Sequence, residues 1–222
     1  MAETAAECVL PLLNRVTGTH ALLLDATDGS IPQLPGIGRW TVLKLSAGGE
    51  RLDGPVRAEV DALPFSDGSF SLVLMRHLVG AGAPVDALVA EASRVLASHG
   101  LLLALEFHSL SLWRPWLARR RRRGEDTLRV VAPSRLQTVL RANGLVVRAQ
   151  WRCGAPWPRS EGMQGLPRWS AEAAGAVYLL KARKRDSNGV VRRLSARRTR
   201  SAREQVPWAP GAQRIIPERR GG

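Results

Sequence analysis

Short, nearly continuous apolar runs alternate with amphipathic stretches along most of the chain. The clearest pair is residues 70–75 and residues 101–107, and the segment between them carries apolar residues at helical spacing. Strands that are apolar throughout are typical of parallel sheets, and parallel neighbours need a crossover of a dozen or more residues. The pattern therefore predicts a strand–helix–strand unit over residues 70–107.

Other apolar runs predict the remaining strands at residues 21–25, 40–45, 57–60, 145–151 and 176–181. Helical spacing predicts a helix over residues 133–143 and a short amino-terminal helix over residues 2–16, interrupted by Pro11. Strands that alternate with helices indicate an α/β fold, in which ligands bind at the carboxyl ends of the strands.

Length and charge add an appendage to this domain. The chain has 222 residues, and 33 Lys and Arg against 19 Asp and Glu give a net charge of +14. Residues 184–222 hold eleven Lys or Arg and three Asp or Glu, with few apolar clusters. We therefore expect a folded domain over residues 1–183 and a basic, mostly disordered tail over residues 184–222. The tail either binds RNA or another polyanion, or only keeps the protein soluble.

Cellular context can also be inferred from the sequence. The two cysteines, Cys8 and Cys153, lie far apart and indicate neither a disulfide framework nor a metal site. The first thirty residues show no secretory signal, and no apolar run approaches the ~20 residues needed to span a bilayer. We expect a cytoplasmic protein without bound metal.

Three spaced segments in the middle of the chain resemble class I S-adenosylmethionine-dependent methyltransferases of type 11. They read Asp61-Ala62-Leu63-Pro64-Phe65, Asp67-Gly68-Ser69-Phe70-Ser71-Leu72-Val73, and Glu91-Ala92-Ser93-Arg94-Val95-Leu96 followed by His99-Gly100. Several spaced elements agree at once, and the resemblance covers residues 22–185 with falling strength toward either end. The chain is also similar to a small proteobacterial group of methyltransferase-like proteins with a weakened glycine motif and a basic tail.

The resemblance implies both a fold and a cofactor. The fold is a Rossmann-like sheet of seven strands, mostly parallel, with helices on both faces and an antiparallel last strand. The cofactor is S-adenosylmethionine, and the methyl acceptor is unknown. The positions that match the cofactor site are Asp25, Gly29, Asp61, Ala62, Arg76 and His77.

Three of these positions also have a simpler interpretation. Gly29 could belong to an ordinary turn after a strand, Asp61 could cap the turn before Leu63, and His77 could be a structural residue. In the family, Asp61 would accept a hydrogen bond from the adenine amino group, and the Ala62 amide would meet a ring nitrogen.

The chain departs from the family pattern at two places. Thr27 and Ile31 stand where the family has glycines, so only Gly29 of the three remains. Lys44, Leu45 and Ser46 stand where the family ends its second strand with the carboxylate that binds the ribose hydroxyls. The nearest acids are Glu50 and Asp53, so we expect weaker cofactor binding.

Candidates for proton transfer follow the fourth and fifth predicted strands. They are His77, Glu106 and His108, whose residue types serve as general acids and bases. Methyl transfer to a good nucleophile needs little such help, and the catalytic residue is therefore left open.

Five consecutive arginines, at residues 119–123, form either a solvated surface or a lip that attracts an anionic substrate. Two functions follow for the whole chain. The first is methyl transfer from S-adenosylmethionine. The second is that of a catalytically inactive binding or scaffold protein of the same fold, which contacts RNA or another polyanion through these arginines and the tail.

Overall fold

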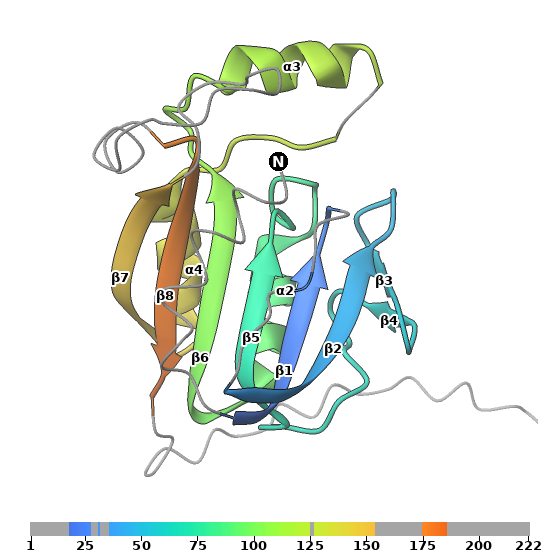
Figure 1. The fold of residues 1–222 in the computed structure, drawn as a ribbon, viewed down its shortest axis with the longest axis vertical. Coiled ribbons are helices and arrows are strands. Elements are labelled where there is room, and N and C mark those ends of the chain that lie inside the picture. Colours follow the sequence, from blue (N-terminus) through green and yellow to red (C-terminus); the bar gives the residue numbers. More distant parts are fainter. Residues whose placement is uncertain (1–17, 28–30, 32–35, 125–126, 154–174, 186–222) are drawn as a thin grey trace, which may run out of the picture. The chain divides into compact units, whose positions relative to one another are not determined.

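The computed structural model describes residues 18–27, 31, 36–124, 127–153 and 175–185 (Figure 1). The chain divides into two units, Met1–Asn188 and Gly189–Gly222, and everything described below belongs to the first. The expected helix over residues 2–16 and almost all of the tail lie outside the described residues. The boundary at residue 183 stays a prediction.

The described strands form one eight-stranded sheet in the order β4-β3-β2-β1-β5-β6-β8-β7 (Figure 1). They are β1 (Gly18–Asp25), β2 (Ile37–Leu45), β3 (Arg51–Asp53), β4 (Ala58–Glu59), β5 (Phe70–Arg76), β6 (Leu96–Phe107), β7 (Leu145–Cys153) and β8 (Val177–Lys184). Strands β2, β1, β5 and β6 are parallel, and β8 is antiparallel to β6 and β7. The predicted Rossmann-like fold with an antiparallel last strand is confirmed.

The strand beyond the seven that were predicted is β3, which arises from a hairpin at the edge of the sheet. It pairs antiparallel with β2, and β4 pairs with β3 over only two residues. The turn is closed by hydrogen bonds from Ser46 N to Arg51 O (2.8 Å) and from Gly49 N to Ser46 O (3.0 Å). Gly49 has a φ of 74°, which glycine adopts without steric cost. The predicted strand over residues 57–60 is thereby reduced to β4.

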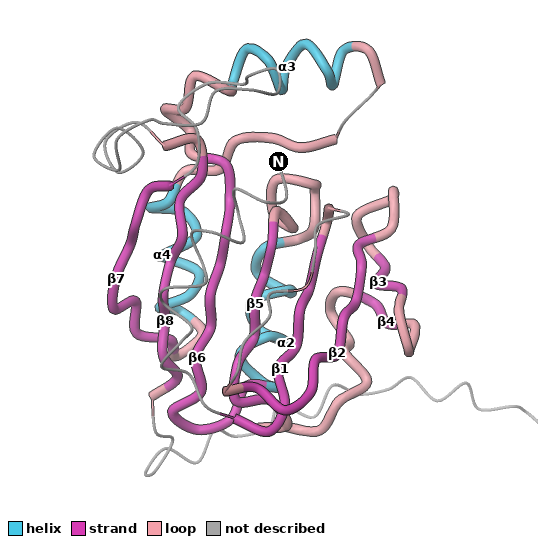
Figure 2. Tube along the Cα trace, viewed as in Figure 1, coloured by secondary structure: helices cyan, strands magenta, loops and turns pink. Residues whose placement is uncertain are grey.

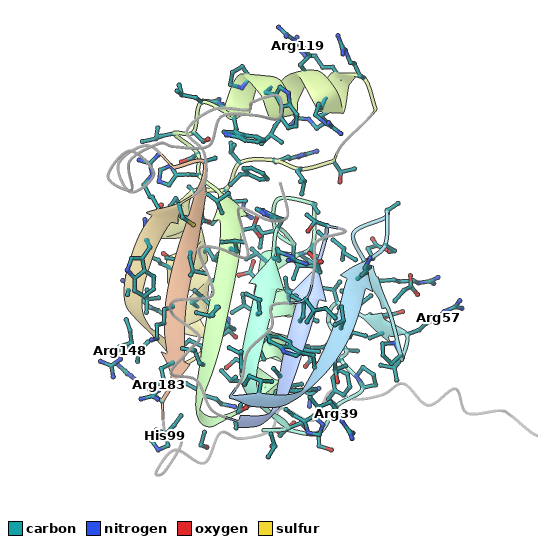
Figure 3. The ribbon with its side chains drawn as sticks, in the orientation of Figure 1. Arg39, Arg57, His99, Arg119, Arg148 and Arg183 are labelled. Carbon is teal, nitrogen blue, oxygen red and sulfur yellow. The ribbon has the colours of Figure 1, made fainter. Side chains whose placement is uncertain are left out.

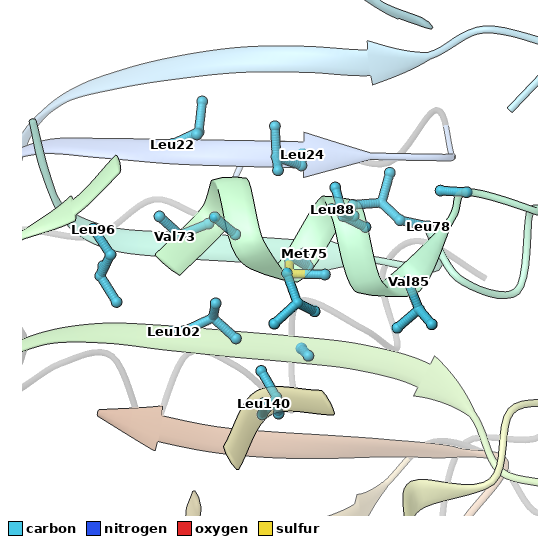
Figure 4. Close-up of a cluster of buried hydrophobic side chains, with 14 of the residues drawn as sticks. Leu22, Leu24, Val73, Met75, Leu78, Val85, Leu88, Leu96, Leu102 and Leu140 are labelled. Atoms are coloured by element: carbon cyan, nitrogen blue, oxygen red, sulfur yellow. The ribbon is translucent and has the colours of Figure 1, made fainter. Parts of the chain in front are cut away.

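Two of the three described helices cover one face of the sheet. They are α2 (Val85–Val95) and α4 (Pro133–Ala142), which confirms the helix predicted between the strands of residues 70–107 and the helix predicted over residues 133–143 (Figure 2). Their apolar sides bury Leu88, Leu136 and Leu140 completely against the strands; Figure 4 shows this cluster. The third helix, α3 (Arg114–Arg122), packs its Leu117 with the apolar side chains of the opposite face.

The segments that carry the family resemblance form a structural clamp. Arg94 of α2 donates to the carbonyl oxygens of Leu63 (2.8 Å) and Phe65 (2.7 Å) and to the carboxylate of Asp67 (2.7 Å). It also pairs with Glu91, which accepts a hydrogen bond from Leu63 N. The clamp fixes the loop before β5 onto α2, and it is therefore a requirement of the fold.

The basic end of the last strand is also structural. The Lys184 ammonium group donates to the carbonyl oxygens of Ser93 and Leu96, both at 2.6 Å, at the carboxyl end of α2. A cation there satisfies unpaired carbonyls and opposes the negative end of the helix dipole. Arg183 donates to His99 O at 3.1 Å. These contacts fasten β8 to the carboxyl end of α2 and to the start of β6.

Candidate functional site

A buried ion pair joins the carboxyl ends of β1 and β5. Asp25 and Arg76 are register partners, only 1% and 2% exposed. Arg76 Nε donates to Asp25 Oδ1 at 2.8 Å, and Arg76 Nη2 donates to Oδ2. The backbone N–H and hydroxyl of Thr27 donate to Oδ1 at 3.0 and 2.9 Å. Two residues predicted to bind cofactor therefore bind each other, and Thr27 takes much of the remaining acceptor capacity of Asp25.

His77 follows this ion pair in a left-handed conformation, with a φ of 55°. Its ring stacks on Phe107, with 4.6 Å between ring centroids, and is 5% exposed. Burial lowers the pKa of His77 to about 4, against the raising effect of Asp25, and Arg76 lowers it further. The imidazole is therefore neutral at pH 7, and within the described part of the chain its Nδ1 has no hydrogen-bond partner.

Glu106, at the end of β6, holds the loop that follows His77. Its carboxyl group accepts hydrogen bonds from Val79 N (2.9 Å) and Gly80 N (3.2 Å). Burial raises the pKa of Glu106 to about 8, although these hydrogen bonds act in the opposite direction. The group is therefore mostly protonated at pH 7, which leaves it a poor general base.

Tyr178 and His108 complete this buried polar cluster. Tyr178 is the register partner of Glu106 on β8, and its hydroxyl has no hydrogen-bond partner among the described residues. Burial and the nearby Glu106 raise the pKa of Tyr178. The His108 ring meets the Tyr178 ring edge-on at 5.8 Å, and its Nδ1 accepts from Leu110 N at 3.0 Å. Sequence reasoning missed Tyr178 because it stands inside an apolar run.

The segment from Leu128 to Val131 crosses the ends of β5 and β6. Arg129 N donates to Gly80 O (2.9 Å), and Val131 N donates to Phe107 O (2.8 Å). A Cβ atom at Gly80 would lie 2.6 Å from Arg129 O, so only glycine fits beneath this segment. Gly80 is a sequence signal that could have indicated the close approach.

Asp61 lies in a different part of the carboxyl edge. It is exposed and lines a cavity of about 370 Å³ with Glu50, Arg51, Glu59, Val60, Pro84 and Ala87. A larger hollow of about 760 Å³ continues along the β3–β4 hairpin, lined by Ser46, Gly48, Glu50, Arg51, Asp53, Arg57, Ala58 and Glu59. The first cavity includes neither Asp25 nor His77 in its lining. The amide of Ala62 donates to Glu59 O at 3.1 Å and is thus already bonded.

The predicted glycine loop and ribose site can be followed only in part. Gly29 lies outside the described residues. Lys44 is the register partner of Asp25 on β2 and is exposed, so the end of β2 presents an ammonium group where the family has a carboxylate. Glu50, beyond the next turn, is the acid that shares a cavity with Asp61.

No group of three or more His, Cys, Asp or Glu side chains among the described residues is arranged to hold a metal ion. None of the helices in the described ranges has the length and apolar character to cross a membrane.

Comparison with known proteins identifies the fold. The family profile described as "Methyltransferase domain" matches residues 41–104. A structure of an S-adenosylmethionine-dependent methyltransferase from Thermotoga maritima is 17% identical, with 82% of this chain and 86% of that chain covered and a TM-score of 0.50. This chain has the methyltransferase fold. No curated protein matches it.

Two other proteins whose structures are similar to this chain are named for different activities. Geranyl diphosphate C-methyltransferase from Streptomyces coelicolor is 13% identical, with 81% of this chain and 76% of that chain covered and a TM-score of 0.53. The [4+2]-cyclase SpnF is 15% identical, with 81% and 79% covered and a TM-score of 0.51. Because one of these proteins is named a cyclase, the fold by itself does not determine the reaction.

Proposed function

We propose that this protein transfers a methyl group from S-adenosylmethionine to an acceptor, and that the nucleoside part of the cofactor binds in the cavity beside Asp61. The observation that carries the proposal is the common lining of this cavity by Asp61, Glu50 and Glu59 within a methyltransferase fold. The family match over residues 41–104 covers these three residues. Geranyl diphosphate methyltransferase structures determined with S-adenosylmethionine or S-adenosylhomocysteine support the same cofactor.

The residues around this cavity suit an adenosyl group. Asp61 would accept a hydrogen bond from the adenine amino group. Glu50 or Glu59 would accept hydrogen bonds from the ribose hydroxyls, in place of the carboxylate that β2 lacks. A carboxylate suits both tasks because it only accepts hydrogen bonds and can hold two donors. The cavity volume of about 370 Å³ lies within the usual range for small-molecule sites, roughly 300–1,000 Å³.

The residues around Asp25 suit the methionine part of the cofactor less well. The Asp25 carboxylate is already paired with Arg76 and bonded by Thr27. A contact with the cofactor would have to compete with these bonds, each worth on the order of 1–3 kcal/mol. We therefore expect affinity well below that of relatives with an intact loop. When bound, the cofactor supplies an electrophilic methyl group, and the chain contributes mainly alignment with the acceptor.

Of the three candidates for proton transfer, His77 is the one left to act as a base, and its pKa of about 4 makes it a weak one. Its imidazole is neutral at pH 7, and its Nδ1 has no hydrogen-bond partner among the described residues. Glu106 is mostly protonated at pH 7, and His108 already accepts a hydrogen bond from Leu110 N. The assignment of His77 as a base is part of the proposal.

A second function, that of a catalytically inactive binding protein, is favoured by one observation. Asp25, Arg76 and the Ala62 amide, all predicted to meet the cofactor, already have partners within the protein. A protein in which these groups bind one another instead of a cofactor can keep the fold and use it to bind other partners.

Calorimetric titration separates the two functions. S-adenosylhomocysteine should bind the wild type and bind Asp61→Asn and the double variant Glu50→Gln/Glu59→Gln roughly 10- to 100-fold more weakly, because each variant loses the charged acceptor for one part of the ligand. Asp86→Asn is the matched control, since Asp86 is exposed and does not line the cavity. No heat at millimolar ligand would select the inactive binding protein.

A further inference from the structure

We propose that α3 and the loop before it form a docking surface for an anionic lipid bilayer. The surface consists of Leu110, Leu112, Arg119 and Arg122, and we call it the α3 surface. All four side chains are exposed. The inference does not rest on methyl transfer, since it concerns only where the protein binds.

The apolar part of the α3 surface is displayed by a well-organised turn. Leu110 is 78% exposed and Leu112 is 59% exposed, more than any other large apolar side chain in the described ranges. Leu110 N donates to His108 Nδ1 (3.0 Å), and Trp113 N donates to the buried Ser111 hydroxyl (3.1 Å). These bonds fix the backbone on both sides of each leucine. The turn therefore holds two apolar side chains in solvent, which costs free energy unless a partner covers them.

The charged part of the α3 surface comes from the last turn of the helix. The sequence of α3 contains no acidic residue. Figure 3 shows Arg119 on the side of α3 that faces away from the strands. Arg122 lies one helical turn further on the same side, whereas Arg120 lies over the ring of Trp116, 4.8 Å from its centroid. Each basic side chain near an anionic membrane contributes about 1 kcal/mol of attraction.

The combination of exposed leucines and arginines on the α3 surface favours a lipid partner over nucleic acid. Exposed leucines beside arginines are typical of segments that lie in the bilayer interface, where apolar side chains enter the acyl boundary. Binding of single-stranded nucleic acid instead uses exposed aromatic rings on which bases stack. Here Trp113 is only 9% exposed and packs against Phe107, while Trp116 meets Trp113 edge-on and lies beneath Arg120.

The inner side of α3 connects this surface to the carboxyl edge of the sheet. Trp113 and Leu117 belong to the same apolar cluster as Phe107, whose ring stacks on His77. Docking through the α3 surface would therefore place the carboxyl edge of the sheet next to the lipid. An acceptor dissolved in or bound to the membrane would then lie within reach of the candidate site.

Vesicle sedimentation with the full chain tests the proposal. Vesicles of phosphatidylcholine alone and mixed with phosphatidylglycerol should differ strongly in the protein they retain. Arg119→Gln/Arg122→Gln should lower the partition coefficient on the anionic vesicles by roughly 30-fold. The matched control, Arg39→Gln/Arg148→Gln, changes the net charge equally at exposed arginines outside the α3 surface. It should change binding far less.

The leucines provide an independent test, because their contribution is insensitive to salt. Leu110→Ser/Leu112→Ser should weaken binding roughly tenfold and make what remains easily displaced by salt. Circular dichroism of each variant confirms that it folds. Equal losses in the α3 double variant and its control would overturn the proposal, since attraction would then follow net charge alone. Retention of RNA that depends on these arginines, without retention of vesicles, would overturn it as well.

Discussion

At the scale of single residues, the carboxyl edge of the sheet is dominated by buried polar groups that depend on one another. Asp25 and Arg76 are both nearly inaccessible, so each compensates the charge of the other. Removing one partner leaves an uncompensated buried charge, which costs more than the pair itself contributes. Substitutions of these buried residues should therefore change the free energy of unfolding by large and non-additive amounts.

The ion pair gives the first prediction. Arg76→Leu should lower the free energy of unfolding by about 3–5 kcal/mol, because Asp25 stays buried without its partner. The double variant Asp25→Leu/Arg76→Leu should recover much of that loss. Arg148→Leu, at an exposed position, should change stability by less than about 0.5 kcal/mol. Urea unfolding measures all three, and a double variant no more stable than the single one would contradict the account.

Glu106 gives a pH-dependent prediction. Its pKa is about 8 in the folded protein, against 4.5 for the ordinary group. The folded state therefore binds the proton more tightly. This stabilisation is fully present below pH 4.5 and is lost as pH rises through about 8. Glu106→Gln should remove this fall in the free energy of unfolding, measured by urea unfolding across the range. An unchanged slope in the variant would show that Glu106 is not its source.

Titration of His77 should change the free energy of unfolding with pH in the opposite direction to that of Glu106. Its pKa is lowered from 6.5 to about 4, so its contribution to stability is present above pH 6.5 and is lost as pH falls through about 4. His77→Asn should flatten this acid limb, since asparagine tolerates a positive φ and carries no titratable charge. His20→Asn, elsewhere on the sheet, serves as the control. Proton NMR titration of the His77 ring should give a midpoint near 4, and a midpoint above 6 would contradict the assigned burial.

At the scale of elements, the basic end of β8 stabilises α2. Lys184→Met removes the donor to the carbonyl oxygens of Ser93 and Leu96. We expect a loss of about 1–2 kcal/mol, because a charged hydrogen-bond donor at a helix end is removed. Lys181→Met on the same strand is the control, and thermal unfolding compares the two. Equal changes would indicate that Lys184 does not cap α2.

The helices and long strands were predictable because periodicity reports burial directly. Residues such as Leu88 and Leu136 recur at helical spacing and are fully buried against the sheet. Strand β3 was not predicted, because it depends on a turn at Gly49 and on pairing with β2 rather than on an apolar pattern. The helical form of the arginine run was also not foreseen, since the pattern is equally compatible with a loop.

At the scale of the whole molecule, the features that identified the fold are not those that would perform the chemistry. Arg94 and Glu91 belong to the segments that carry the family resemblance, and in the structure they clamp the loop before β5 to α2. The pairing of Asp25 with Arg76 could not be predicted from the sequence, because it joins residues 51 positions apart through strand register. Glu50 was named from the sequence only as one of the nearest acids, and its place in the lining of the cavity of Asp61 depends on the turn between β2 and β3.

The central claim is that the cavity beside Asp61 receives the nucleoside of the cofactor. A crystal structure of the complex with S-adenosylhomocysteine tests it most directly. We predict that the adenine amino group lies within hydrogen-bonding distance of Asp61, with the ribose hydroxyls at Glu50 or Glu59. Density for the ligand elsewhere on the protein, or none in crystals grown with a saturating concentration, would contradict the claim.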